Sequence, residues 1–211
     1  MNKKSVTGLL GGLLGALLFS SAMAAVDMAP DVLAKTTTLD VIAIVKQDKD
    51  IQAGNTKKVL DLVEAKVLPH FNFAHMTQLA VGKNWGRASA AQQQVLVKEF
   101  QALLVRTYSN SLTNYKNQVI EFKPLKMQPA DTDVTVRTEV IQPGTRAVPI
   151  DYSMEKMPNG WKVYDVTVDG VSLVTNYRGS FNVQVRQGGI EGLIQSLVDK
   201  NKQNVEANAR K

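Results

Sequence analysis

The chain has 211 residues, of which 44% are hydrophobic and 21% charged, which is the balance of one folded globular domain and not of a disordered, collagen-like or integral membrane protein. It contains no cysteine, and this excludes disulfide scaffolds, thiol catalysis, thiolate zinc sites and iron–sulfur clusters. The formal net charge is +6, but basic residues beyond the N-terminus form runs of only two, as at Lys57-Lys58, so nucleic-acid binding is excluded as well.

The first 24 residues are typical of a secretory signal peptide. Lys3 and Lys4 give a basic start, residues 6–19 are apolar, and Ala22-Met23-Ala24 supplies an Ala-x-Ala ending. The apolar stretch is shorter than the roughly 20 residues that a membrane-spanning helix needs. We therefore expect cleavage after Ala24 and export to a bacterial periplasm. Loss of the two lysines lowers the net charge of the mature domain, residues 25–211, from +6 to +4.

Two helices are predicted to open the mature chain. The first covers residues 30–47, where Pro30 suits a first helical turn. Its expected buried stripe is Val32, Thr36, Leu39 and Ala43. Gly54-Asn55 interrupts the pattern, and the second helix follows and ends before Pro69. Its expected stripe is Val59, Leu60, Val63 and Val67.

Two further helices have capping signals. Asn72 is a good N-cap for a short helix that ends at Gly82. Ser89, with Gln92 three residues later, forms the capping-box pattern of a long amphipathic helix that we expect to reach Tyr115. Its expected stripe is Leu96, Phe100, Leu103, Leu104, Thr107, Tyr108, Ser111 and Tyr115.

After Tyr115 the hydrophobic period changes from that of a helix to that of a strand. Strands are predicted at residues 119–122, 133–141, 150–155 and 161–168, with turns at Pro143-Gly144 and residues 158–160. In the last strand Tyr164, Val166 and Val168 share one parity. Trp161 and Val163 have the opposite parity, so apolar residues occur on both faces. We therefore expect this strand to be central, bulged or covered on both faces.

The C-terminal part of the chain is predicted to be helical again. Ser172 is expected to cap a helix over residues 173–187, and Gly188-Gly189 separates it from a last helix. Residues after Lys200 are polar and expected to fray. Helices, then hairpin-linked strands, then helices predict a single α+β domain, in which an antiparallel sheet of four to five strands packs against several helices on one face.

Motifs that carry chemistry are absent from the sequence. His70 and His75 would point about 140° apart on a helix, so no metal site is expected. Gly-x-Ser-x-Gly, Gly-x-Gly-x-x-Gly and Walker patterns do not occur. Asp151 and Glu155 have the polar parity of their strand and are expected on a solvated face. Asp165 is interpreted as a structural hydrogen-bond acceptor or, alternatively, a site residue. The residues thus favour binding over catalysis without identifying a ligand.

Apolar residues dominate the face of the sheet and helices that we expect to point inward. They are Phe71, Phe73, Met76, Leu79, Phe100, Leu104, Tyr108, Val136, Ile150, Tyr152, Met154, Val166 and Val168. By periodicity alone a plain packed core is the simpler interpretation, because apolar stripes are what helices and sheets use to pack. The pattern does not distinguish a filled core from a cavity.

Two blocks of residues resemble the MlaC family of periplasmic phospholipid-binding proteins, also called toluene-tolerance proteins. The first block is Leu68-Pro69-His70-Phe71-Asn72-Phe73, then Gly82, Trp85, Gln92 and Phe100, then residues 104–108 and Tyr115. The second is residues 161–166, 169–174 and 176–178, and then Phe181. One departure is Asn72, where the family commonly has aspartate; both residues cap helices well.

The resemblance implies a nuclear-transport-factor-2-like fold with a deep apolar pocket and no cofactor. The pocket would hold the acyl chains of a diacyl phospholipid such as phosphatidylethanolamine or phosphatidylglycerol, and it would also include Leu173, Val174 and Tyr177. The family implies a periplasmic monomer, not an enzyme, that binds no nucleic acid. It would shuttle lipid between an outer-membrane lipoprotein complex and an inner-membrane ABC transporter complex with a membrane-anchored substrate-binding subunit. This intermembrane trafficking maintains outer-membrane lipid asymmetry.

Two alternatives from other classes stay open at this point. A periplasmic chaperone-like binding module would also use an apolar concavity and need no catalytic residues. An enzyme of the ketosteroid-isomerase kind would need a carboxylate and a tyrosine in the cavity. Its nearest candidates are Asp165 with Tyr164 or Tyr152.

Overall fold

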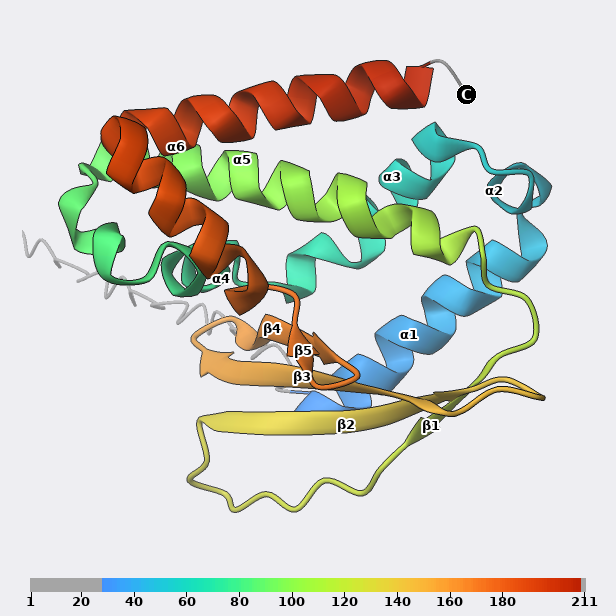
Figure 1. The fold of residues 1–211 in the computed structure, drawn as a ribbon. Coiled ribbons are helices and arrows are strands. Elements are labelled where there is room, and N and C mark those ends of the chain that lie inside the picture. Colours follow the sequence, from blue (N-terminus) through green and yellow to red (C-terminus); the bar gives the residue numbers. More distant parts are fainter. Residues whose placement is uncertain (1–27, 210–211) are drawn as a thin grey trace, which may run out of the picture.

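Helices precede and follow a five-stranded antiparallel sheet in residues 28–209, the part of the chain that the computed structural model describes (Figure 1). The helices cover one face of the sheet, so the predicted α+β class is confirmed. The predicted signal peptide, residues 1–24, lies outside the described residues. None of the described helices is both long enough and apolar enough to cross a bilayer.

The elements follow one another in the predicted order. The α-helices are α1 Pro30–Gln47, α2 Lys49–Gln52, α3 Thr56–Lys66, α4 Phe73–Val81, α5 Ala90–Tyr108 and α6 Arg178–Ala209. Short 3-10 helices are η1 Leu68–His70, η2 Gly82–Arg87, η3 Ser109–Leu112 and η4 Thr175–Tyr177. The strands are β1 Val119–Phe122, β2 Asp133–Ile141, β3 Val148–Met157, β4 Gly160–Val168 and β5 Val171–Ser172, and they lie side by side in chain order.

Helix α1 has the predicted bounds, but its predicted buried stripe is wrong. Val32 and Leu39 are 47% and 48% exposed, whereas Val41 and Val45 are buried. Helix α1 has apolar or β-branched residues on both faces, so periodicity did not identify the inner one. The face that points inward carries Leu33, Ala34, Thr37, Thr38, Val41, Ile42 and Val45.

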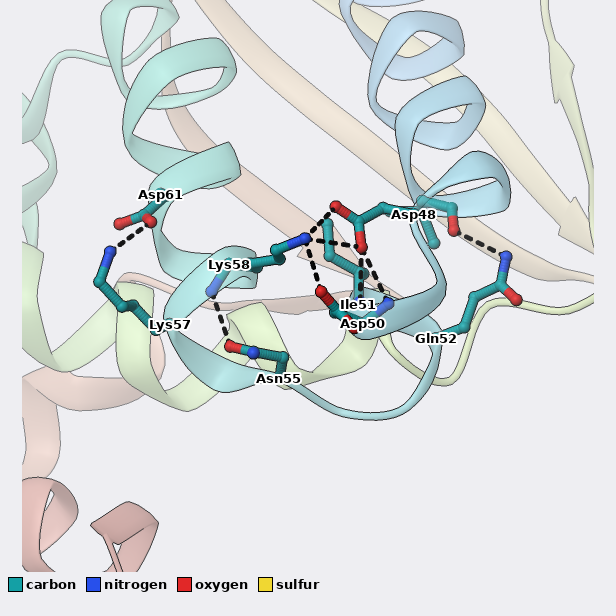
Figure 2. Close-up of polar contacts among 9 residues, drawn as sticks. Asp48, Asp50, Ile51, Gln52, Asn55, Lys57, Lys58 and Asp61 are labelled. Carbon is teal, nitrogen blue, oxygen red and sulfur yellow. Dashed lines mark hydrogen bonds and ion pairs between the residues drawn. The ribbon is translucent and has the colours of Figure 1, made fainter.

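A network of polar contacts fixes the turn from α1 through α2 to α3 (Figure 2). The carboxylate of Asp48 accepts hydrogen bonds from the backbone N–H groups of Asp50 and Ile51 and so caps α2. The Lys58 ammonium lies 3.0 Å from Asp48 Oδ2 and 2.7 Å from Asp50 Oδ2. The four-residue helix α2 was not predicted, because it is too short to show a helical period.

The capping signals of α4 and α5 are confirmed. Asn72 Oδ1 accepts from the N–H of His75, and Ser89 and Gln92 form the reciprocal capping box. Helix α5 nevertheless ends at Tyr108 and not at Tyr115, since a 3-10 turn follows over Ser109–Leu112. The Ser109-Asn110-Ser111 run has low helix propensity, which accounts for the early end.

A β-bulge at Tyr164 explains the double parity of the last long strand. Tyr152 pairs with Val166 and Met154 with Val163, so Tyr164 is an extra residue without a partner on β3. The extra residue brings Val163 and Val166, three residues apart, to the same face of the sheet. Three explanations were predicted, namely that the strand is central, bulged or covered on both faces, and the bulge is confirmed.

The C-terminal helix differs from prediction at both ends. It begins at Arg178, because the Ser172 hydroxyl accepts from the N–H groups of Val174 and Thr175 and holds a turn there. It bends at Gly188-Gly189, where a break was predicted, and Gly189 has a φ of 66°. It then continues to Ala209, past Lys200. The buried Asn201 bonds to the carbonyl of Glu99 on α5 and helps to hold this end in place.

Apolar side chains form three clusters. The largest lies between α4, α5 and α6 and includes Leu96, Phe100, Leu103 and Leu193. A second joins α1, α2 and α3, and a third lies on the inner face of the sheet around Val136, Met154 and Trp161. The space between the second and third clusters is where the candidate site lies.

Candidate functional site

A cavity with a volume of about 440 Å³ lies between α1, the sheet and the segment that follows α5. Helix α1 forms one wall through the seven residues of its inner face. The sheet forms another through Ile120, Val140, Ile150, Tyr152, Met154 and Val163. Val67, His70, Phe71, Ser111, Leu112, Asn114, Tyr115 and Gln118 complete the lining.

A smaller cavity of about 220 Å³ adjoins the first, deeper in the helical layer. Its lining is Val63, Val67, Leu68, Phe71, Phe73, Met76, Leu104, Val105, Tyr108, Ser109, Leu112, Val166 and Leu173. Val67, Phe71 and Leu112 line both cavities, so their side chains form the partition between them. Both cavities are partly open.

The lining is suited to an apolar ligand. Among the described residues that face the two cavities there is no Asp or Glu. His70 is the one lining residue that titrates near neutral pH, and burial, together with the positive charge of Lys162, lowers its pKa. A lowered pKa favours the uncharged imidazole at neutral pH, so the wall there stays without charge.

Tyr152 brings a polar group into the larger cavity. Its hydroxyl lies next to the side chains of Thr38 on α1 and Thr138 on β2, and burial raises its pKa above the ordinary value of 10.0. The tyrosine ring therefore spans the space between the sheet and α1. In the smaller cavity, burial and the neighbouring Tyr177 raise the pKa of Tyr108 to about 12, so its phenol is neutral.

The structure brings most of the sequence-predicted pocket residues to these cavities. Phe71, Ile150, Tyr152 and Met154 line the larger one, and Phe71, Phe73, Met76, Leu104, Tyr108, Val166 and Leu173 line the smaller one. Leu79, Phe100, Val174 and Tyr177 lie instead in the cluster between α4, α5 and α6. Val136 is in the sheet cluster, and Val168 pairs with Ile150 in the sheet.

Sequence reasoning did not find the wall that α1 provides. The signal was present, since Leu33, Thr37, Val41 and Val45 recur every four residues, but the threonine weakened the pattern. The lining segment of residues 111–118 gives no separate signal, because Ser111 and Tyr115 continue the helical spacing of the preceding stripe.

Two carboxylates have structural partners. Asp165 accepts hydrogen bonds from the N–H of Val166 and the hydroxyl of Ser172, as the structural interpretation predicted, and it lines neither cavity. Glu155 is not on a solvated face as predicted. It is half-buried and contacts Asn72 Nδ2 at 2.8 Å and His75 Nδ1 at 2.9 Å, because the start of α4 packs over this end of β3.

The fold and its cavities define a class of single-domain α+β proteins that enclose an apolar ligand between a sheet and the helices packed on it. The family model described as MlaC protein matches residues 35–199. This chain belongs to the MlaC family.

Two curated relatives are similar over most of their length. The intermembrane phospholipid transport system binding protein MlaC of Haemophilus influenzae is 30% identical over 161 residues, which cover 70% of this chain and 73% of that protein. The toluene tolerance protein of Pseudomonas putida is 23% identical over 179 residues, which cover 84% of this chain and 83% of that protein.

A solved structure is similar in both sequence and fold. It is the phospholipid-binding protein of Ralstonia solanacearum in complex with a phospholipid, which is 40% identical. The match covers 84% of this chain and 99% of that one, with a TM-score of 0.78.

Proposed function

We propose that this protein is a periplasmic phospholipid carrier that encloses acyl chains in the two cavities beside its sheet. The observation that carries the proposal is the hollow itself, two adjoining apolar spaces without a carboxylate in their described lining. The relative from Ralstonia solanacearum, 40% identical, binds a phospholipid in its solved structure. The pocket residues proposed for this chain are those that line the two cavities.

The physical basis is the transfer of methylene groups out of water. Each buried methylene contributes roughly 0.8 kcal/mol, so a diacyl lipid does not cross an aqueous compartment unaided but is held firmly once its chains are enclosed. Because the chains supply the affinity, the headgroup stays outside and contributes little selectivity. Met76 and Met154 suit chains of variable length, since methionine is flexible and polarizable.

Membership of the MlaC family supports an inference about the location and partners of the carrier. We infer that residues 1–24 direct export and that residues 25–211 act as a monomer in the periplasm. The names of the relatives refer to an intermembrane phospholipid transport system and to toluene tolerance. We infer exchange of lipid with an outer-membrane lipoprotein complex and an inner-membrane ABC transporter complex.

Binding is favoured over catalysis by the position of the acidic residues. A ketosteroid-isomerase-like reaction needs a carboxylate next to the substrate. Asp165 bonds to Ser172 and lines neither cavity, and the Tyr164 hydroxyl donates to Asp133 at 2.8 Å and also lies outside both linings. The enzyme alternative therefore lacks its base.

The direct test is mass spectrometry of the protein purified from periplasm without detergent, both intact and after organic extraction. We expect stoichiometric diacyl phospholipid of mixed headgroup. Peptide in place of lipid would favour a chaperone-like module. A protein that is free of lipid, and takes none up from vesicles, would contradict the proposal.

A variant links the lipid to the larger cavity. Ile150 lines this cavity and is half-buried, so Ile150→Lys places a charge in the cavity while the chain can still fold. We expect a folded protein with little lipid. Val119→Lys is the control, because Val119 is 62% exposed and lies outside the cavity lining. Equal lipid content in both variants would contradict the pocket assignment.

A further inference from the structure

A third hollow lies on the outer side of α5, between α3, η1 and α4. It is a wide, open groove of about 770 Å³. Its lining is Leu60, Glu64, Leu68, Ala74, Trp85, Ala90, Gln93, Gln94, Val97, Lys98, Gln101, Ala102, Val105 and Arg106. The proposed acyl site does not use this groove.

The groove adjoins the smaller cavity, and the smaller cavity adjoins the larger one, because neighbouring spaces share lining residues. Leu68 and Val105 line both the groove and the smaller cavity. Val67, Phe71 and Leu112 line both the smaller and the larger cavity. Three hollows therefore follow one another across the domain, and only these apolar side chains are common to the linings of neighbouring spaces. Leu68 and Val105 are half-buried, so one side of each already faces the groove.

The groove differs in chemistry from the two cavities. It combines apolar side chains with glutamines and three charged residues, Glu64, Lys98 and Arg106. The charge of these three sums to +1. Within residues 28–209, neither Lys98 nor Arg106 forms an ion pair, and Arg106 Nη1 donates to the uncharged carbonyl of Asn201 at 2.7 Å.

Trp85 gives the groove a further feature of a lipid interface. Its ring is half-buried and lines the groove near Gln93, whose side-chain amide donates to the Trp85 carbonyl. Tryptophan is enriched where apolar chains meet polar headgroups, because its ring is amphipathic. Apolar walls, an amphipathic ring and net positive charge together match one molecule of phospholipid.

We propose that this groove is a second lipid portal. The phosphate of a phospholipid lies near Lys98 and Arg106, and one acyl chain passes between Leu68 and Val105 into the smaller cavity. This inference rests on the proposed function and extends it, since it gives the carrier a route on the side of α5 away from the larger cavity. In this proposal Leu68 and Val105 are the side chains that rotate to open the first partition.

Site-specific quenching tests the portal, and the cysteine-free chain makes single labels straightforward. Gln101→Cys puts a bimane fluorophore in the groove, and Gln118→Cys puts it at the larger cavity. Gln187→Cys, at an exposed position of α6, is the control. Each labelled protein is mixed with phosphatidylglycerol vesicles whose acyl chains carry bromine, and the protein is then separated from the vesicles. Bromine quenches only fluorophores that it approaches closely.

The outcomes separate this proposal from the proposed function. Quenching at 101 and 118 but not at 187 is expected. Quenching at 118 alone, or equal quenching at all three positions, would overturn the second portal while leaving the carrier in place. Absence of quenching together with absence of phospholipid in the mass spectrum would overturn both.

A charge variant gives a second measurement. Lys98→Gln removes an uncompensated charge of the groove, and we expect the apparent affinity for these vesicles, read from quenching at position 101, to fall about fivefold. Lys83→Gln is the matched control, since Lys83 is exposed and does not line the groove. An equal effect of both substitutions would show general attraction to an anionic surface and count against the portal.

Discussion

The two halves of the helical layer have similar apolar residues but are filled differently. Between α4, α5 and α6 the side chains interlock, and Phe100 is fully buried with edge contacts to Tyr177 and Phe181 at centroid distances of 5.2 and 5.3 Å. Between α1 and the sheet, Ile150 and Tyr152 are only half-buried, because they face the 440 Å³ cavity.

The difference comes from the size of the facing side chains. Helix α5 presents Leu96, Phe100 and Leu103 to its neighbours, and these large side chains are buried in the cluster shared with α4 and α6. Helix α1 presents Ala34, Thr37 and Thr38 to the sheet, and these short side chains leave part of the space between α1 and the sheet unfilled. A hollow therefore results from small residues on one wall, and not from a shortage of apolar residues.

The largest expected effect is in the filled half. Phe100→Ala removes a fully buried ring, and we expect the free energy of unfolding to fall by about 3–5 kcal/mol in chemical denaturation. The loss should be the same whether or not phospholipid is present, because Phe100 lines neither cavity. A loss that depends on lipid would contradict the division into two halves.

In the hollow half, Ile150→Ala is expected to cost about 2 kcal/mol or less in the delipidated protein, since the cavity already lacks contacts there. Addition of phospholipid should then stabilise the variant less than the parent, because a ligand stabilises in proportion to its affinity. Thermal unfolding with and without lipid measures both quantities. A variant that gains as much from lipid as the parent would place the acyl chains elsewhere.

Tyr152→Phe tests a polar contact across the larger cavity. The variant keeps the ring but removes the hydroxyl beside Thr38 and Thr138, so we expect a loss of about 1 kcal/mol in urea unfolding. Hydrogen exchange in α1 should become faster, while exchange in α5 should be unchanged. Equal acceleration in both helices would show that Tyr152 does not specifically hold α1.

The smallest effect is expected at the surface network of Figure 2, outside both halves. The Lys58 ammonium and backbone N–H groups lower the pKa of Asp48 below its ordinary 3.8, and the two carboxylates raise the pKa of Lys58 above 10.5. A lowered carboxyl pKa stabilises the fold above 3.8 and loses this effect as pH falls through the lowered value. A raised lysine pKa stabilises the fold below 10.5 and loses this effect as pH rises through the raised value.

Lys58→Met should therefore lower Tm slightly at neutral pH, and the difference from the parent should shrink as the solution is acidified well below pH 3.8. Lys57→Met is the control, because the Lys57–Asp61 pair is more exposed, with side chains 83% and 58% accessible. A difference that persists unchanged in acid would show that Lys58 acts through its aliphatic chain and not through its charge.

Much of the fold could be predicted from the sequence because its signals are local. Asn72 and Ser89 cap helices through their own side chains, and the alternation in residues 133–141 requires only that one face be buried. The turn at Pro143-Gly144 is likewise local, and Gly144 has the positive φ of 80° that a type II turn needs.

The parts that could not be predicted depend on contacts between distant segments. Which face of α1 is buried depends on the sheet that it meets about 100 residues later along the chain. The hollow depends on the volumes of both walls together, which no single stretch of sequence contains. The resemblance to the MlaC family supplied the expectation of a pocket, and periodicity alone favoured a filled core.

The bulge at Tyr164 shifts the alternation of inward and outward side chains along β4 by one residue. Before the extra residue, odd-numbered positions such as Val163 face inward, and after it the even-numbered Val166 does so. An alignment of related sequences that is shifted by one residue at the bulge would therefore assign every following side chain of β4 to the wrong face of the sheet. Counting from the bulge, and not from the start of the strand, keeps Val166 on the wall of the smaller cavity.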